Sequence, residues 1–300
     1  LGHEFVNVEK QLGVSFKTSP ANPTLAGFAQ DAYDKARSDL KVYKTWSQSM
    51  AQRAMNYIPF GAKPADDTLP AIHGLARHFT VCDRWFSSVP GPTWPNRFFA
   101  MLGSCNGHLL MPSTGTVLAG IKSLIAQFGG ESIFSLLRNN GHDARIYSDG
   151  AVPLAALVKG GLQHLSIEAF KSDVAADKLP ELSWIEPSYG LLNGKLGPNV
   201  SHHPPEDLRF GDQFVGEVFN ALSANTTVWN KTLFVLLYDE HGGFHDHVVP
   251  PTCVATGSTV DVPWKNPFTR LGVRVPAILA SPWLKPGLIP WTGDVQAQHY

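Results

Sequence analysis

The sequence has few of the features that mark membrane, nucleic-acid-binding or disulfide-rich proteins. It contains no run of 18 apolar residues, so no transmembrane helix is expected. Its formal net charge of −1 argues against a nucleic-acid partner, because proteins that bind nucleic acid carry a basic surface. Its three cysteines, Cys82, Cys105 and Cys253, lack the C-x2-C spacing of zinc modules and allow at most one disulfide within the chain.

The apolar segments that are present alternate between strand and helix patterns. Short runs rich in β-branched and aromatic residues predict buried strands at 144–149, 182–187, 232–240 and 273–282. Helical spacing predicts helices over 131–141, with Ser132 as the N-cap, and over 211–225. This alternation predicts an α/β fold with a mostly parallel sheet covered by helices on both faces. Stretches rich in Pro and Gly predict long loops at 187–205, 250–267 and 281–293.

The strand predicted at 232–240 ends in two adjacent carboxylates, Asp239 and Glu240. In open α/β sheets, ligands bind at the carboxyl ends of the strands. Both carboxylates can reach one cation if the chain bends directly after them, and Gly242 and Gly243 permit that bend. With histidine nearby, this pattern suits a divalent metal. The alternative interpretation is a solvated strand end with a capping carboxylate.

A second candidate site lies in the stretch "FSSVPGPTWPNRFF" at 86–99. Its three prolines place Thr93 on a stiff, bent loop that could hold a hydroxyl in a fixed geometry. A threonine becomes a nucleophile only when a base or a metal activates it. Asn96 and Arg97 could hold phosphate-like oxygens. The alternative is a proline-stiffened surface loop without chemistry.

Some of the chain's twelve histidines form a third group of candidates. His202 and His203 precede a double proline, so they lie on a loop of restricted conformation. Such a pair is more typical of a surface or an interface than of a catalytic site. His3 and His164 carry no functional signal by themselves, and a structural role is the simpler interpretation of each.

Taken together, several blocks resemble one family. They are "CDRWFSSVPGPTWPNRFFAMLGS", "LPELSWIEPSY", "HPPEDLRFGDQFVGEVFNAL", "TLFVLLYDEHGGFHDHVVPP" and "LGVRVPAILASPWLKPG". In this order they resemble the phosphoesterase family, which includes non-specific phospholipases C and a class of bacterial acid phosphatases. The resemblance implies an alkaline-phosphatase-like α/β fold. It also implies hydrolysis of phosphate esters by a hydroxyl nucleophile held at a metal.

The resemblance also implies roles for individual residues. It makes Thr93 the nucleophile and a metal contact, and makes Asp239 and Glu240 metal ligands. The residues that it places around the phosphate are His3, His164 and His203. Those that it places in substrate contact or in support of the site are Asn96, Arg97, His202, His241 and Asp246. Oxygen ligands would suit calcium, and the nearby histidines keep zinc open.

The family pattern extends beyond both ends of the chain. It has two further metal ligands, an adjacent Glu and Asn, before His3, and a His-Thr motif after the last residue. We therefore expect residues 1–300 to be a single phosphoesterase catalytic domain that is incomplete at both ends. Three Asn-x-Ser/Thr patterns hint at a secreted, periplasmic or cell-surface location.

Three functions stay open on the sequence alone. The first is a phospholipase C that releases a phosphorylated head group from a phospholipid and contacts the membrane peripherally. The second is an acid phosphatase acting on small monoesters, and the third is a degenerate family member that only binds. Aromatic residues near Thr93 would favour an amphiphilic substrate, unless they only pack in the core: Trp85, Trp94, Phe98 and Phe99.

Overall fold

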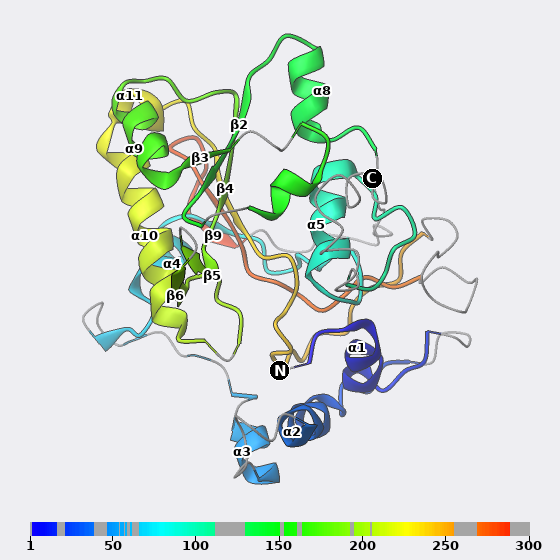
Figure 1. The fold of residues 1–300 in the computed structure, drawn as a ribbon. Helices are drawn as coiled ribbons and strands as arrows, with labels where there is room; N and C mark the ends of the chain where they lie inside the picture. Colours follow the sequence, from blue (N-terminus) through cyan, green and yellow to red (C-terminus); the bar gives the residue numbers. More distant parts are fainter. Residues whose placement is uncertain are drawn as a thin grey trace.

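Helices pack around separate sheets in the computed structural model of the chain (Figure 1). The structure describes residues 2–16, 22–38, 47–53, 55–56, 58, 61, 66–111, 130–150, 153–160, 164–192, 195–204, 206–254 and 269–288. Of the loops predicted at 250–267 and 281–293, residues 255–267 and 289–293 lie outside these residues. Within the second predicted loop, Gly287 and Leu288 form a short strand, so that stretch is not all loop.

A four-stranded sheet has the order β7-β8-β1-β9. Its strands are β1 (Thr80–Val81), β7 (Phe234–Leu237), β8 (Ala277–Ala280) and β9 (Gly287–Leu288). Strand β8 runs antiparallel to both of its neighbours, whereas β1 and β9 are parallel. In the β7–β8 register, Phe234 lies opposite Ala280 and Leu237 lies opposite Ala277. This sheet is therefore mixed.

A three-stranded sheet, of order β3-β2-β4, is entirely parallel. Its strands are β2 (Ala144–Ser148), β3 (His164–Ser166) and β4 (Leu182–Glu186). Adjacent residues of a strand point to opposite faces. Ile146 of β2 belongs to a core cluster with Phe134, and Tyr147 belongs to another cluster with Phe170. Helices thus cover both faces of this sheet, and the α/β prediction is confirmed.

The helices come from all parts of the chain. They are α1 (Phe5–Leu12), α2 (Phe28–Ser38), α3 (Gln48–Arg53), α4 (Pro70–His78), α5 (Thr93–Leu102), α8 (Ile133–Asn139), α9 (Ile167–Ala175), α10 (Leu208–Ala224) and α11 (Thr226–Trp229), with a 3-10 turn at Leu154–Leu157. Figure 1 shows α9, α10 and α11 together on one side of the β2–β4 sheet. Helices α1 and α2 pack on each other near the amino terminus.

The two predicted helices form, with different boundaries. Helix α8 has the predicted N-cap, because the Ser132 hydroxyl accepts the Ser135 N–H at 3.2 Å. Helix α10 begins at Leu208, earlier than predicted, because Asp207 supplies a cap by accepting the Arg209 N–H at 3.0 Å.

Three predictions about strands and loops need correction. Strand β7 was expected to be buried, but Val235 and Leu237 are 46% and 39% exposed. They share one face of the strand, whereas Phe234 and Leu236 on the other face pack against a core cluster. Strand β8 begins only after Pro276, which lacks the N–H that a sheet ladder needs. The stretch 187–205 is not all loop, since β5 (Tyr189–Leu192) and β6 (Lys195–Asn199) pair as an antiparallel hairpin.

Candidate active site

A cleft of about 800 Å³ opens where β7 ends. Residues from widely separated segments line it, including His3 near the amino terminus, Thr93 at the start of α5, and Asp239 and Glu240 after β7. Of the residues predicted for the site, only Asn96 and His164 are absent from its lining. The fold therefore gathers most of the predicted site residues in one cavity.

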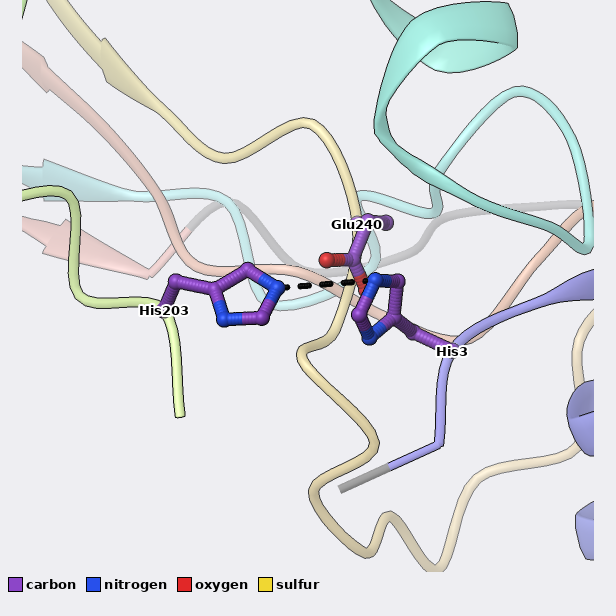
Figure 2. A group of neighbouring side chains, drawn as sticks. All are labelled: His3, His203 and Glu240. Atoms are coloured by element: carbon purple, nitrogen blue, oxygen red, sulfur yellow. Dashed lines mark hydrogen bonds between the residues drawn. The ribbon is translucent and has the colours of Figure 1, made fainter. Parts of the chain in front are cut away.

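Two histidines meet a carboxylate inside this cleft (Figure 2). The Nε2 atoms of His3 and His203 lie 3.5 Å apart. Their rings are nearly perpendicular, with centroids 4.8 Å apart and an interplanar angle of 84°. One ligand atom from each histidine and one carboxylate oxygen of Glu240 lie within 4.8 Å of one another. This is a compact set of donor atoms.

The Glu240 carboxylate is held by the turn that follows it. Its Oε2 accepts the Gly242 N–H at 2.6 Å. Gly242 and Gly243 have φ values of 64° and 76°, which glycine adopts at little cost, so the predicted bend is present. Burial raises the pKa of Glu240 well above its usual value, and the neighbouring Asp239 charge adds to this shift.

Asp239 points to a different partner. Its Oδ2 accepts from Arg97 Nε at 2.6 Å, and its Oδ1 accepts the Glu240 N–H at 2.9 Å. The Arg97 guanidinium also lies 3.4 Å from Glu186 Oε1, measured from Nη1, and 5.6 Å from the ring centre of Tyr189. Arg97 thus joins the ends of β4 and β7, and it is ion-paired with protein carboxylates.

Thr93 is the first residue of α5, directly after the N-cap Pro92. The Asn96 side chain fixes the loop that leads to it. Its Oδ1 accepts the Val89 N–H at 2.8 Å, and its Nδ2 donates to the carbonyls of Gly91 at 3.0 Å and Pro92 at 3.1 Å. Asn96 is only 4% exposed, so it braces the loop and does not reach the cleft.

The paired histidines have separate roles. The His202 ring stacks on Tyr238 with centroids 5.7 Å apart and an interplanar angle of 6°, and its Nδ1 hydrogen-bonds the Tyr238 hydroxyl. A Cβ at Gly211 would lie 2.2 Å from the His202 ring, so this packing requires glycine there. His202 therefore anchors its loop, while His203 turns toward Glu240.

His241 lies behind the cluster. Its Nε2 is 2.7 Å from Gln11 Oε1. The Gln11 amide nitrogen donates to the Gly2 carbonyl at 2.7 Å and to Asp31 Oδ2 at 2.8 Å. Because the amide oxygen of Gln11 can only accept, His241 Nε2 carries the proton. Burial, and next the charge of His3, lower the pKa of His241 to about 3, so the ring is neutral.

A bidentate ion pair supports the loop that contains Asp246. Arg274 Nε and Nη2 each lie 2.7 Å from the Asp246 carboxylate, and Arg274 Nη1 donates to the Asp83 carbonyl at 2.9 Å. Burial raises the pKa of Asp246, but the Arg274 hydrogen bonds and charge bring it below its usual value. Asp246 is therefore held by Arg274; its supporting role in the site, which the family resemblance implies, stays a prediction.

A model of the phosphoesterase family matches residues 3–293 of the chain. The chain belongs to this family. It is 36% identical to non-specific phospholipase C6 of Arabidopsis thaliana, over 96% of this chain and 51% of that protein. It is 27% identical to the non-hemolytic phospholipase C of Pseudomonas aeruginosa, over 87% of this chain and 40% of that protein. The chain thus spans about half the length of the curated relatives that it matches.

Among solved structures, this phosphoesterase is similar to a protein of the alkaline phosphatase superfamily from Vibrio parahaemolyticus. The TM-score is 0.43 with 15% identity, covering 74% of this chain and 56% of that chain. A similarity of this size carries no argument about function. None of the described helices combines the length and apolarity needed to cross a membrane.

One predicted site residue of this phosphoesterase lies elsewhere. His164 begins β3, at the edge of the parallel sheet, where it pairs with Ile146. It was expected beside the phosphate, but it does not line the cleft. Of the aromatic residues near Thr93, Phe98 and Phe99 are buried in the core, whereas Trp85 is 40% exposed. None of the three cysteines forms a disulfide.

Four residues of the site were missed by sequence reasoning: Gln11, Glu186, Tyr238 and Arg274. Glu186 had a usable signal, because it ends the strand predicted at 182–187 just as Asp239 follows β7. Ligands of open α/β sheets bind at the carboxyl ends of strands, but only the end of the strand at 232–240 was expected to carry the site. The other three act through contacts between distant segments, which no local pattern reveals.

Proposed function

We propose that this chain is the catalytic part of a divalent-metal-dependent phosphoric ester hydrolase that cleaves phospholipids as a phospholipase C. The observation that carries the proposal is the buried Glu240 carboxylate, which faces His3 and His203 in the same cleft as Thr93. The phospholipase C names of the relatives in two kingdoms support the choice of substrate.

The donor atoms of the cleft fit a divalent metal. A buried carboxylate and two imidazoles within 4.8 Å of one another are ligand types that such ions take. The family resemblance adds Asp239 and Thr93 to the residues that would hold the ion. When bound, the ion would favour the alkoxide form of the Thr93 hydroxyl and polarise the phosphoryl oxygens.

Thr93 carries out the first displacement. Its Oγ attacks phosphorus in line, so that an Oγ–P bond forms while the bond from phosphorus to the glycerol oxygen breaks. Thr93 begins α5, and the N–H groups at the start of a helix attract anions, which supports a phosphate bound beside it. A cleft histidine gives a proton to the departing glycerol oxygen.

Water completes the cycle. It attacks phosphorus, breaks the Oγ–P bond and releases the phosphorylated head group, while Thr93 recovers its proton. Arg97 holds Asp239 in place beside the reaction through the 2.6 Å ion pair. A rigid arrangement of this kind lowers the entropy cost of bringing the reacting groups together.

The apolar part of the cleft favours a phospholipid over a small monoester. Its wall includes Leu69, Ile72 and Ala76 from the region of α4, and Ile278 from β8. An amphiphilic substrate can bury acyl or glycerol carbons there, at about 25 cal/mol per Å² of apolar surface. A soluble phosphate monoester would leave this wall unused.

The test compares two substrates with the full-length protein. We expect faster turnover of phosphatidylcholine than of p-nitrophenyl phosphate, loss of both activities after chelation, and recovery when a divalent ion is restored. Preference for the aryl monoester would establish the acid phosphatase alternative. No turnover of either substrate, with retained ligand binding, would establish the binding module. Secretion and membrane-surface contact stay predictions.

A further inference from the structure

Four carboxylate side chains line the described part of the cleft: Asp83, Asp239, Glu240 and Asp246. Three of them have partners within the protein. Asp239 accepts from Arg97 Nε at 2.6 Å, and Asp246 accepts from two Arg274 nitrogens at 2.7 Å. Glu240 accepts the Gly242 N–H and faces two histidines. Asp83 differs, because its Oδ1 is buried and no described residue forms a hydrogen bond or an ion pair with its carboxylate.

Two arginines lie beside Asp83 without pairing with its carboxylate. Arg84, the next residue, lies over the Phe86 ring, with its guanidinium carbon 5.8 Å from the ring centre. Arg274 donates from Nη1 to the Asp83 main-chain carbonyl at 2.9 Å, and its other two nitrogens hold Asp246. The main chain of Asp83 is therefore fixed, whereas its side chain has no partner. A carboxylate oxygen buried without a partner costs free energy, so a fold that keeps one calls for an explanation.

The sheet topology puts Asp83 at the same edge of the sheet as Asp239 and Glu240. Strand β8 runs antiparallel to both β7 and β1, so β7 and β1 run in the same direction. Their carboxyl ends therefore lie at one edge, where Asp239 follows β7 and Asp83 follows β1. Because β8 lies between them and neighbouring strands are about 4.8 Å apart, the two strand ends are about 10 Å apart. Side chains that reach in from both ends can contact one ligand a few ångströms long.

Resting on the proposed function, we propose that Asp83 binds the cationic nitrogen of the phospholipid head group, choline or ethanolamine. In such a lipid, two carbons separate the phosphate ester oxygen from the nitrogen. With its phosphorus beside Thr93 in the cleft, the head group extends from the end of β7 toward the end of β1. There the Asp83 carboxylate meets a charge of the opposite sign, and in a partly buried site this attraction is stronger than it is in water.

This assignment makes Asp83 a residue that determines specificity. It does not touch the reacting atoms, so it favours lipids with a cationic head group over lipids with an uncharged one by strengthening their binding. Trp94, which follows Thr93 directly, also lines the cleft. Aromatic faces attract quaternary ammonium groups, which makes Trp94 the candidate for a second contact with choline.

The first test measures the binding of phosphocholine and of its uncharged isostere, dimethylbutyl phosphate, to the metal-loaded full-length protein by calorimetry. The unaltered protein should bind phosphocholine about tenfold more tightly, because one contact with a charged group contributes a factor of roughly this size. Asp83→Asn should bind the two ligands equally. Asp66→Asn, the matched control at an exposed aspartate, should keep the preference. Equal binding of both ligands by the unaltered protein overturns the proposal, whether or not the variant folds.

The second test compares hydrolysis of phosphatidylcholine and of phosphatidylglycerol with the same acyl chains, in micelles of an uncharged detergent. Asp83→Asn should raise KM for phosphatidylcholine about tenfold with kcat little changed, and should leave phosphatidylglycerol turnover unaffected. A variant that keeps the preference for phosphocholine overturns the proposal. So does one that weakens both ligands equally, because Asp83 would then act on the phosphate or the ion. If the unaltered protein hydrolyses neither lipid, the proposed function fails, and the binding comparison still decides the role of Asp83.

Discussion

The Nε2 atoms of His3 and His203 lie 3.5 Å apart, although 200 positions separate the two residues in the chain. This pair depends on two independent anchors. Gln11 hydrogen-bonds the Gly2 carbonyl beside His3, and Tyr238 holds His202 beside His203. Because each anchor is buried or partly buried, the two histidines are positioned before any ligand arrives, which lowers the cost of binding one.

Gln11 should tune metal affinity without touching the metal. Gln11→Leu removes the contacts to Gly2 and His241, so we expect affinity for the divalent ion of the proposed function to fall by roughly 10–100-fold. Gln213→Leu, at an exposed position of α10, is the control and should leave the affinity unchanged. The measurement is competition for the ion with a chromogenic chelator, on metal-stripped full-length protein. Equal affinities in the two variants would show that Gln11 does not position the site.

Gly242 should tolerate no side chain. Its φ is 64°, and an added Cβ would lie 3.0 Å from Pro204 Cδ. Gly242→Ala should therefore lower the free energy of unfolding by about 1–2 kcal/mol, the cost of a left-handed conformation for an L-residue. Gly74→Ala in helix α4 is the control, because an added Cβ meets nothing within 4 Å there. Urea unfolding measures both, and an equally stable Gly242→Ala would contradict the strain.

We expect the Asn96 side chain to contribute both to the stability of the fold and to the rate of catalysis. Asn96→Ala leaves the buried Val89 N–H without its partner and releases the loop before Thr93. We expect a loss of about 1–3 kcal/mol in the free energy of unfolding, the cost of an unsatisfied buried group. The rate at saturating substrate should also fall. Asn220→Ala, on the exposed side of α10, should change neither quantity.

We expect the Asp67 carboxylate to make the free energy of unfolding depend on pH in the acid range. Burial would raise the pKa of Asp67, but hydrogen bonds from His73, the Leu69 backbone and Arg77 lower it to about 2. The pKa of Asp in an unfolded chain is about 3.9. The stabilisation that the Asp67 carboxylate contributes is therefore present above that pH, and it is lost as the pH falls toward about 2. In urea unfolding, Asp67→Asn should be less stable than the unaltered protein at neutral pH.

That difference should shrink across the acid range. The control is Asp66→Asn at the exposed neighbouring position. A difference between Asp67→Asn and the unaltered protein that stays constant from pH 7 to pH 2 would show that the Asp67 charge does not contribute through these partners.

The site was largely predictable from sequence where its residues sit in one short segment. Asp239, Glu240 and the two glycines follow a strand directly, and strand ends are where such folds bind ligands. Gln11 was not predictable, because its role depends on His241, which lies 230 positions away. His164 was placed beside the phosphate by resemblance alone, and in the structure it begins β3 and does not line the cleft.

For the fold too, the features that depend on local sequence were predictable, and those that depend on distant contacts were not. The Ser132 cap is a local signal and was found. The β5–β6 hairpin also had a local signal, since the sequence between its strands is Asn-Gly, a pair typical of hairpin turns, but Pro- and Gly-rich composition suggested a loop. The exposure of Val235 and Leu237 depends on what covers the face of β7 that they share, which the strand's own apolar sequence does not reveal.

The most direct test of the central claim is phosphatidylcholine hydrolysis by the full-length, metal-loaded protein and its Thr93→Ala and Thr93→Ser variants. The account predicts that Thr93→Ala loses roughly 10⁴-fold or more in turnover, as expected for a lost nucleophile, while Thr93→Ser keeps measurable activity. Thr227→Ala, at an exposed threonine, is the matched control. Turnover by Thr93→Ala at the rate of the unaltered protein would contradict the account.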